Sequence, residues 1–149
     1  MIPPFDASGD LPPGIYRATP DEIYTRFCHG EVREYWGNIL RDVIALAQGT
    51  GKLQAIYLFG SFVTAKEAPA DVDLFLVMSS DFASHEVEGH ARLLFDRSRA
   101  AIVWGICVYW ITARTERMPF LEAWQLRRDG GRRGIVEVQA LLPTIKNSR

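Results

Sequence analysis

Hydrophobic and polar residues alternate in two helical patterns in the first third of the chain. Between residues 31 and 48, apolar side chains recur every three or four positions and form one wide stripe, which predicts an amphipathic helix packed on a sheet. Gly49 stands where a helix C-cap glycine is expected. A shorter helix is predicted from about Thr19 to Cys28, because Thr19 supplies a capping hydroxyl, a proline follows it, and Glu22 can close a capping box.

Four further segments, rich in β-branched and aromatic residues, predict strands: 54–59, 71–78, 102–112 and 135–142. The second segment is apolar on both faces after its first three residues, which is typical of a strand in the interior of a sheet. Two more helices are expected, a long one over residues 84–99 and a short one over residues 119–127.

These elements together predict an α/β (α+β) fold: a single compact domain with a mixed β-sheet of four or five strands and helices packed on one face. A chain of 149 residues is long enough to bury one substantial core. Residues 1–14, which end in a stiff Pro-Pro-Gly turn, are expected to form an extended N-terminal arm. The domain is then expected to cover residues 15–149.

Composition and charge exclude several classes of protein. The net charge of −1 argues against a broad nucleic-acid-binding surface, which normally carries a basic excess. No apolar run approaches the roughly 20 residues of a membrane helix, and the first residues lack the layout of a signal peptide. The sequence therefore predicts a cytoplasmic protein without a membrane partner.

The candidate chemistry lies between Leu58 and Met78. Asp71 and Asp73 are two positions apart on a predicted strand, so their carboxylates are expected to project from the same side and share a hard cation such as Mg²⁺ or Mn²⁺. Gly60 lets a phosphate approach the backbone, and Ser61 with the amides after it offers hydrogen-bond donors. A donor-rich turn facing a metal-binding pair suits a nucleoside triphosphate.

Gly60-Ser61, nine further residues and then Asp71-Val-Asp73 form a pattern that resembles the signature of the DNA polymerase β nucleotidyltransferase superfamily, especially its minimal bacterial members. More narrowly, the runs 12–19 and 60–67, together with the ending Arg128-Asp-Gly and Gly134-Ile-Val, are similar to a family of small, largely uncharacterised bacterial and phage proteins in that superfamily. The resemblance implies that Asp71 and Asp73 hold the catalytic metal and that Gly60 and Ser61 hold the triphosphate.

The resemblance also implies a third carboxylate on a neighbouring strand, which would help to hold the metal and deprotonate the attacking hydroxyl. The expected strand, 102–112, contains no Asp or Glu, and Gly105 or Cys107 occupies the expected place. Neither can replace a carboxylate as a magnesium ligand. Glu137, Glu116 and Glu122 are alternative candidates, although none matches by position.

Several basic residues have two interpretations. Lys66 could reach the β- or γ-phosphate as a point charge, or form an exposed pair with Glu67. The arginine cluster, defined as Arg127, Arg128, Arg132 and Arg133, could bind phosphate, RNA or an acidic partner, or could simply be a soluble turn.

Two principal hypotheses about function follow. The first is an enzyme that transfers a nucleoside monophosphate from a nucleoside triphosphate to a hydroxyl of a protein or RNA. The second is a catalytically impaired nucleotide-binding or interaction module, such as one component of a toxin–antitoxin or phage-defence pair. The missing third carboxylate favours the second hypothesis, whereas the retained Gly-Ser turn and aspartate pair favour the first.

Overall fold

The computed structural model describes residues 1–139, and its centre is a five-stranded mixed sheet. The strands are β1 (Ile15–Ala18), β2 (Leu53–Phe59), β3 (Asp73–Met78), β4 (Cys107–Thr112) and β5 (Ile135–Val138). Their spatial order is β1-β5-β2-β3-β4. The β1–β5 and β3–β4 pairs are parallel, while β2 runs antiparallel to both β3 and β5. The predicted mixed sheet of four or five strands is confirmed.

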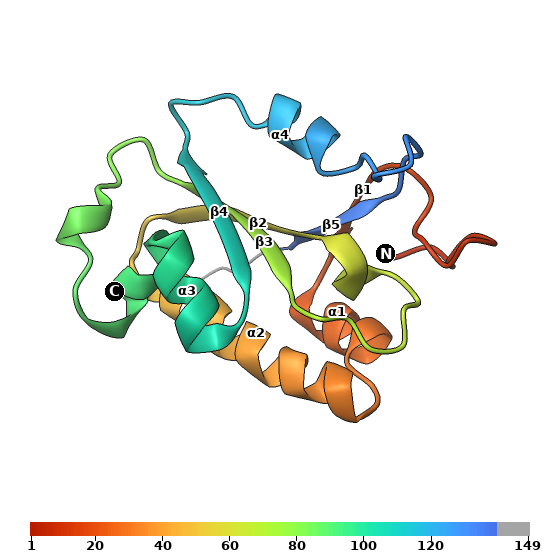
Figure 1. Ribbon diagram of the computed structural model, residues 1–149. Helices are drawn as coiled ribbons and strands as arrows, with labels where there is room; N and C mark the ends of the chain where they lie inside the picture. The colour runs from red at the N-terminus through yellow and green to blue at the C-terminus, as the bar shows by residue number, and fades with distance from the viewer. Residues whose placement is uncertain (140–149) are drawn as a thin grey trace.

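Helices cover both faces of this sheet (Figure 1). The helices are α1 (Pro20–Phe27), α2 (Glu31–Gly49), α3 (Arg97–Trp104) and α4 (Met118–Ala123), with short 3-10 segments η1 (Gly60–Val63), η2 (Ser84–Glu86) and η3 (Gly89–Phe95). The helices predicted to pack on one face of the sheet correspond to α1, α2 and α3, which share the main hydrophobic core with that face. On the opposite face, α4 and the residues after it cover a second, smaller core, where Trp124 stacks on Phe59 at 4.3 Å between ring centroids.

The two N-terminal helices form where their sequence signals predict them. Thr19 accepts a hydrogen bond from the Glu22 amide at 3.1 Å, and the Glu22 carboxylate accepts one from the Thr19 amide, which completes the capping box. The apolar stripe of α2 buries Leu40 and Val43 against the sheet. Gly49 is the last residue of α2 rather than its cap, and Gly51, with a φ of 72°, is the residue in the left-handed conformation that follows.

The single helix predicted over residues 84–99 is wrong. Gly89, with a φ of 70°, separates η2 from η3, and a new helix, α3, begins only after Asp96 caps it through the Arg99 amide. Two 3-10 segments replace one helix: η3 packs against α2, α3 and β4, and η2 packs against η3.

The strand predicted over residues 102–112 is wrong in its first part. Ile102 and Val103 have high β-propensity, yet they lie on α3 with 83% and 42% of their surfaces exposed. Gly105, with a φ of 72°, ends the helix in the left-handed conformation, and β4 begins at Cys107. Local propensity misplaced this boundary because α3 has no clear apolar stripe of its own.

Two strands at one side of the sheet complete the comparison with the sequence. β1 was not predicted, because its four residues lie between proline-rich and helix-capping sequences. β5 confirms the start of the strand expected over residues 135–142, whose last three residues lie outside the described part. Within residues 1–139, no helix has both the length and the apolar character needed to span a membrane.

Candidate functional site

The five residues predicted to form the site line one cleft of about 910 Å³: Gly60, Ser61, Lys66, Asp71 and Asp73. We call it the aspartate cleft. It lies where β2 ends in η1 and where β3 begins, so the antiparallel pairing of these strands brings the two halves of the motif together. The other walls come from residues 8–10 of the N-terminal arm and from the turn that carries the arginine cluster.

Gly60 is the point of closest contact between the two halves of the motif. Its φ of 77° lies in the left-handed region, and Phe59 pairs directly with Asp73 across the β2–β3 ladder. A Cβ atom on residue 60 would overlap Oδ2 of Asp73. Only glycine therefore satisfies both the backbone turn and the position of the Asp73 carboxylate.

The two aspartates form an uncompensated acidic pair. Within residues 1–139, neither carboxylate accepts a hydrogen bond or takes part in an ion pair. Burial raises the pKa of Asp73 to about 6, the negative charge of Asp71 adds to this effect, and the positive charge of Arg133 opposes it. This pair is therefore strained by desolvation and repulsion, both of which a divalent cation would relieve.

The raised pKa of Asp73 predicts a pH-dependent penalty on stability. The folded carboxyl, with a pKa of about 6, binds its proton more tightly than the unfolded one, with a pKa of 3.8, so stability falls as pH rises between these values. The shift corresponds to about 3 kcal/mol, which partial solvent exposure reduces to roughly 1 to 2 kcal/mol. Asp73→Asn is expected to exceed the wild type in free energy of unfolding by this amount at pH 8 and to match it near pH 4.

Urea titrations of both proteins across this pH range measure the difference directly, and ionisable groups common to both cancel. Asp71→Asn is the companion variant. It removes the second cause of the raised Asp73 pKa and should flatten the pH dependence without abolishing it. A wild type and Asp73→Asn variant whose stabilities differ equally at pH 4 and pH 8 would contradict the assignment.

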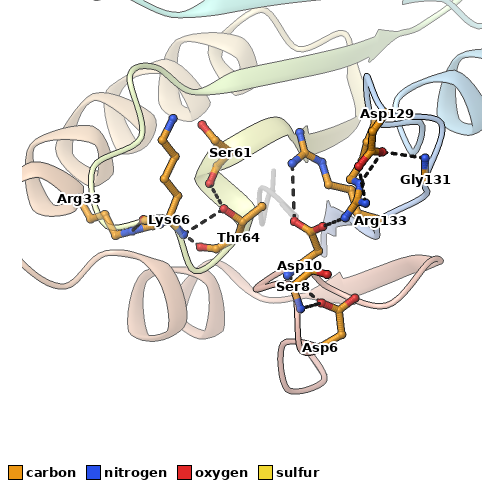
Figure 2. Close-up of polar contacts among 11 residues, drawn as sticks. Asp6, Ser8, Asp10, Arg33, Ser61, Thr64, Lys66, Asp129, Gly131 and Arg133 are labelled. Carbon is orange, nitrogen blue, oxygen red and sulfur yellow. Dashed lines mark hydrogen bonds and ion pairs between the residues drawn. The ribbon is translucent and has the colours of Figure 1, made fainter.

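Arg33 of α2 holds the loop that follows η1. Its guanidinium is 4% exposed and donates hydrogen bonds to four backbone carbonyls, those of Phe27, Phe62, Thr64 and Lys66, at 2.7 to 3.2 Å. Figure 2 shows this side chain reaching the backbone of the loop beside Ser61. The Arg33 guanidinium thus joins α1 and α2 to the loop after η1, which we call the motif loop. Arg33 therefore fixes the cleft wall that carries Ser61 and Lys66.

Removing the Arg33 guanidinium is expected to loosen this wall. Arg33→Met keeps the aliphatic stem but leaves the carbonyls without their donor, which should lower the free energy of unfolding by about 2 to 3 kcal/mol. Arg41→Met is the matched control, because Arg41 lies on the same helix, is exposed, and makes one hydrogen bond, to Asn38. Chemical denaturation of both variants provides the measurement. Equal losses in the two variants would show that the carbonyl contacts contribute nothing particular.

The N-terminal arm forms the wall opposite the motif loop. Gly9 accepts a backbone hydrogen bond from Ala65 at 2.8 Å, which fastens the arm to the loop. Asp10 is 6% exposed, and its carboxylate forms ion pairs with Arg127 at 2.6 Å and Arg133 at 3.6 Å. Figure 2 shows Asp10 between the turn at Asp6 and the side chains of the arginine cluster. The arm predicted from its prolines thus contributes a buried acid to the cleft.

The members of the arginine cluster have different environments. Arg127 is fully engaged, because it also pairs with Asp129 at 2.7 Å, and these hydrogen bonds raise its pKa. Arg128 is exposed in the cleft and forms no ion pair or hydrogen bond within residues 1–139. Arg132 lies outside the cleft lining, in a β-bridge with Leu126. The interpretation as a turn without a ligand therefore suits Arg127, whose charge is already paired, while Arg128 and Arg133 face the cleft.

Within residues 1–139, no substitute for the third carboxylate lies beside the aspartate pair. Cys107 is the parallel neighbour of Asp73 on β4, at the position expected from chain order. Glu137 pairs with Arg17 at 3.5 Å and does not line the cleft, and neither do Glu116 and Glu122. Within the described residues, no three acidic, histidine or cysteine side chains come together as a metal site.

Sequence reasoning missed Arg33, Thr64 and Asp10. Arg33 lies at a position of the α2 stripe that ordinary patterning assigns to an apolar residue, so an arginine within a buried face was the available signal. Thr64 is buried and donates to the Ser61 carbonyl at 2.7 Å, which shapes the turn after Ser61. Asp10 had no signal, because its role depends on arginines more than 115 residues away in sequence.

The residues present fit a divalent cation accompanied by a phosphate ligand better than a cation held by protein alone. Two carboxylates that have no hydrogen-bond or ion-pair partner in the described part of the chain supply oxygen ligands, and Mg²⁺ is usually held by one or two carboxylates with substrate phosphates. Two acidic groups are too few for a closed protein cage. The donor set thus suits a cation that arrives with a polyphosphate.

The chain has little similarity to curated proteins or to solved structures. No curated protein matches the chain. One solved structure, a tri-AMPylated Shewanella oneidensis HEPN toxin in complex with MNT antitoxin, contains a chain that is 22% identical over 57% of this chain, with a TM-score of 0.34. The match covers 61% of that chain, so this protein corresponds to about three fifths of its length. A TM-score this low does not establish a common fold.

A family profile, in contrast, spans nearly the whole described part of the molecule, including both halves of the motif, the N-terminal arm and β5. It matches residues 3–139, and the chain therefore belongs to the family of unknown function DUF6932.

Proposed function

We propose that the protein is a metal-dependent nucleotidyltransferase of the DNA polymerase β type, which binds a nucleoside triphosphate in the aspartate cleft. The observation that carries the proposal is the convergence of Gly60, Ser61 and Lys66 with Asp71 and Asp73 in one cleft of about 910 Å³. A space of this size accommodates a nucleotide. The two aspartates lack protein partners within residues 1–139, as metal ligands awaiting a cation would.

Each residue has a role in this proposal. Asp71 and Asp73 hold Mg²⁺ or Mn²⁺, which when bound would neutralise the acidic pair and the polyphosphate together. Gly60 allows close approach of the phosphates to the backbone, Ser61 donates to them, and Lys66, exposed at the cleft, supplies a positive charge. Arg33 keeps Ser61 and Lys66 in place from beneath the loop.

The proposed reaction is a displacement at the α-phosphorus. The oxygen of an acceptor hydroxyl forms a bond to this phosphorus, the bond between the α-phosphorus and the oxygen leading to the β-phosphate breaks, and pyrophosphate leaves. The hydroxyl proton passes to water, because residues 1–139 offer no third carboxylate beside the pair. The acceptor is a protein or RNA hydroxyl supplied by another molecule.

The second candidate is a nucleotide-binding module without turnover, such as one component of a toxin–antitoxin or phage-defence pair. Cys107 beside Asp73 favours it, because a thiol at this position neither binds magnesium well nor accepts a proton as a carboxylate would. In this case the cleft would bind the metal and the nucleotide, and its occupancy would control a protein contact.

Label transfer distinguishes the two candidates. The protein is incubated with each α-labelled nucleoside triphosphate, Mg²⁺ or Mn²⁺, and lysate from the source cell, and labelled protein and RNA are separated. The enzyme hypothesis expects label transfer by the wild type and its loss in the double variant Asp71→Asn/Asp73→Asn. Both substitutions keep the shape of the side chain and remove a metal ligand. Absence of transfer, or equal transfer by both proteins, would reject the enzyme and leave the binding module.

A further inference from the structure

The aspartate cleft contains unpaired charges of both signs. Eight charged side chains line it, four acidic and four basic, so its formal charge is zero. Arg127 is compensated by Asp10 and Asp129. The remaining charges are the aspartate pair on one side and Lys66, Arg128 and a weakly held Arg133 on the other.

Arg133 is a partly buried member of these basic groups, and its hydrogen-bonding capacity is not satisfied. Its Nη1 lies 3.6 Å from Oδ1 of Asp10, which is an ion pair but too long for a good hydrogen bond. Its Nε is buried and has no hydrogen-bond partner within the described residues. A guanidinium with one desolvated, unsatisfied donor and one long ion pair gains free energy when an anion supplies further acceptors to its accessible donors.

The N-terminal arm holds Arg133 in the cleft. Asp10 is fixed by the turn that begins at Asp6, since its amide donates to Asp6 Oδ1 at 3.1 Å and its carbonyl accepts from the Asp6 amide at 2.7 Å. The backbone amide of Arg133 donates to Gln125 at 2.8 Å. The backbone segments that carry Asp10 and Arg133 are therefore both anchored, which keeps this pair at the wall of the cleft.

The arrangement selects among anionic ligands. A carboxylate or a single phosphate would satisfy Arg133 but leave the aspartate pair uncompensated. A polyphosphate that carries a divalent cation satisfies both, because its oxygens reach the arginines while its cation lies against the aspartates. Planar arginine donors match two phosphate oxygens at once.

We propose that Arg133 and Arg128 form a phosphate-binding subsite on the arm side of the cleft, which binds the terminal phosphates of the nucleotide, the part that leaves as pyrophosphate. This inference rests on the proposed function and adds the residues that contact the leaving group. Lys66 then approaches the same phosphates from the motif loop. The arginine turn and the N-terminal arm become parts of the substrate site.

The magnesium complex of inorganic tripolyphosphate, which carries no base or sugar, is the probe for this subsite. Isothermal titration is expected to show binding to the wild type and about tenfold weaker binding to Arg133→Gln. Arg132→Gln is the matched control, because it removes the same charge one residue away and outside the cleft lining. Arg128→Gln, an exposed turn residue whose loss leaves the fold intact, should weaken binding about three- to fivefold and guards against misfolding of the Arg133 variant.

The outcomes separate this subsite from the proposed function. Equal affinities for the Arg133, Arg128 and Arg132 variants, or no binding of tripolyphosphate to the wild type, would overturn the subsite. Nucleotide binding that needs Mg²⁺ and the aspartates would survive that result. Conversely, tripolyphosphate bound through Arg133 by a protein that shows no magnesium-dependent nucleotide binding would support the subsite and reject the proposed function.

Discussion

Replacing Gly60 with alanine is expected to lower the free energy of unfolding by about 3 kcal/mol. Roughly 1 kcal/mol comes from forcing a residue with a Cβ into the left-handed conformation at a φ of 77°. The remainder comes from overlap of the new methyl group with Oδ2 of Asp73, in a region where β2 and β3 are buried and cannot separate. Because the carboxylate must move, metal-dependent nucleotide binding should be lost as well.

Two variants separate these contributions. Gly51→Ala changes a glycine with a similar φ of 72° and no atom within 4 Å of the added Cβ, so it should show the conformational cost alone. Gly60→Ala in an Asp73→Ala background should also cost only about 1 kcal/mol, because the overlapping carboxylate is gone. Denaturant titrations of the wild type, Gly60→Ala, Asp73→Ala and the double variant give the coupling between residues 60 and 73. Additive effects would mean that the carboxylate does not lie against Gly60.

The helices and strands that carry strong local signals were predictable. The capping box at Thr19, the stripe of α2 and the apolar runs of β2 and β3 each specify one structure without help from distant residues. The boundary between α3 and β4 was not predictable, since Ile102 and Val103 favour a strand locally while Gly105 and the packing of Ala100 determine the helix. A tertiary contact decided that segment.

The candidate site also has one part that the sequence could predict and one part that it could not. Gly60 and Ser61 directly follow β2, and Asp71 and Asp73 lie just before and at the start of β3, so their convergence followed from the antiparallel pairing of these two strands. Asp10 and Arg133 reach the cleft from opposite ends of the chain through β1 and β5, and no spacing in the sequence relates them. The acidic half of the site was therefore foreseeable, whereas its pairing with a basic wall required the structure.

Neutralising the aspartate pair should have the largest effect on ligand binding. In Asp71→Asn/Asp73→Asn, the side chains keep their size but no longer compensate a divalent cation, so affinity for the magnesium complex of a nucleoside triphosphate should fall by about 100-fold, or roughly 2.7 kcal/mol. The variant should be at least as stable as the wild type at pH 8, since the burial of a charged carboxylate and the repulsion from Asp71, which together raise the pKa of Asp73, are both gone. Lost binding in a stable protein cannot be attributed to unfolding.

Glu137→Gln is the control for charge removal, because Glu137 is partly buried and paired with Arg17 but lies outside the cleft lining. Its affinity for the nucleotide should equal that of the wild type. A loss as large as that of the double aspartate variant would point to a general effect of charge instead of a metal site.

Titration calorimetry of the wild type with each of the four ribonucleoside triphosphates, in the presence of Mg²⁺ and again with the cation chelated, tests most directly whether the aspartate cleft binds a metal–polyphosphate complex. The account predicts binding of at least one triphosphate that weakens by about 100-fold on chelation, with no such dependence in Asp71→Asn/Asp73→Asn. Affinities that are unchanged by chelation, or no binding of any of the four, would contradict it.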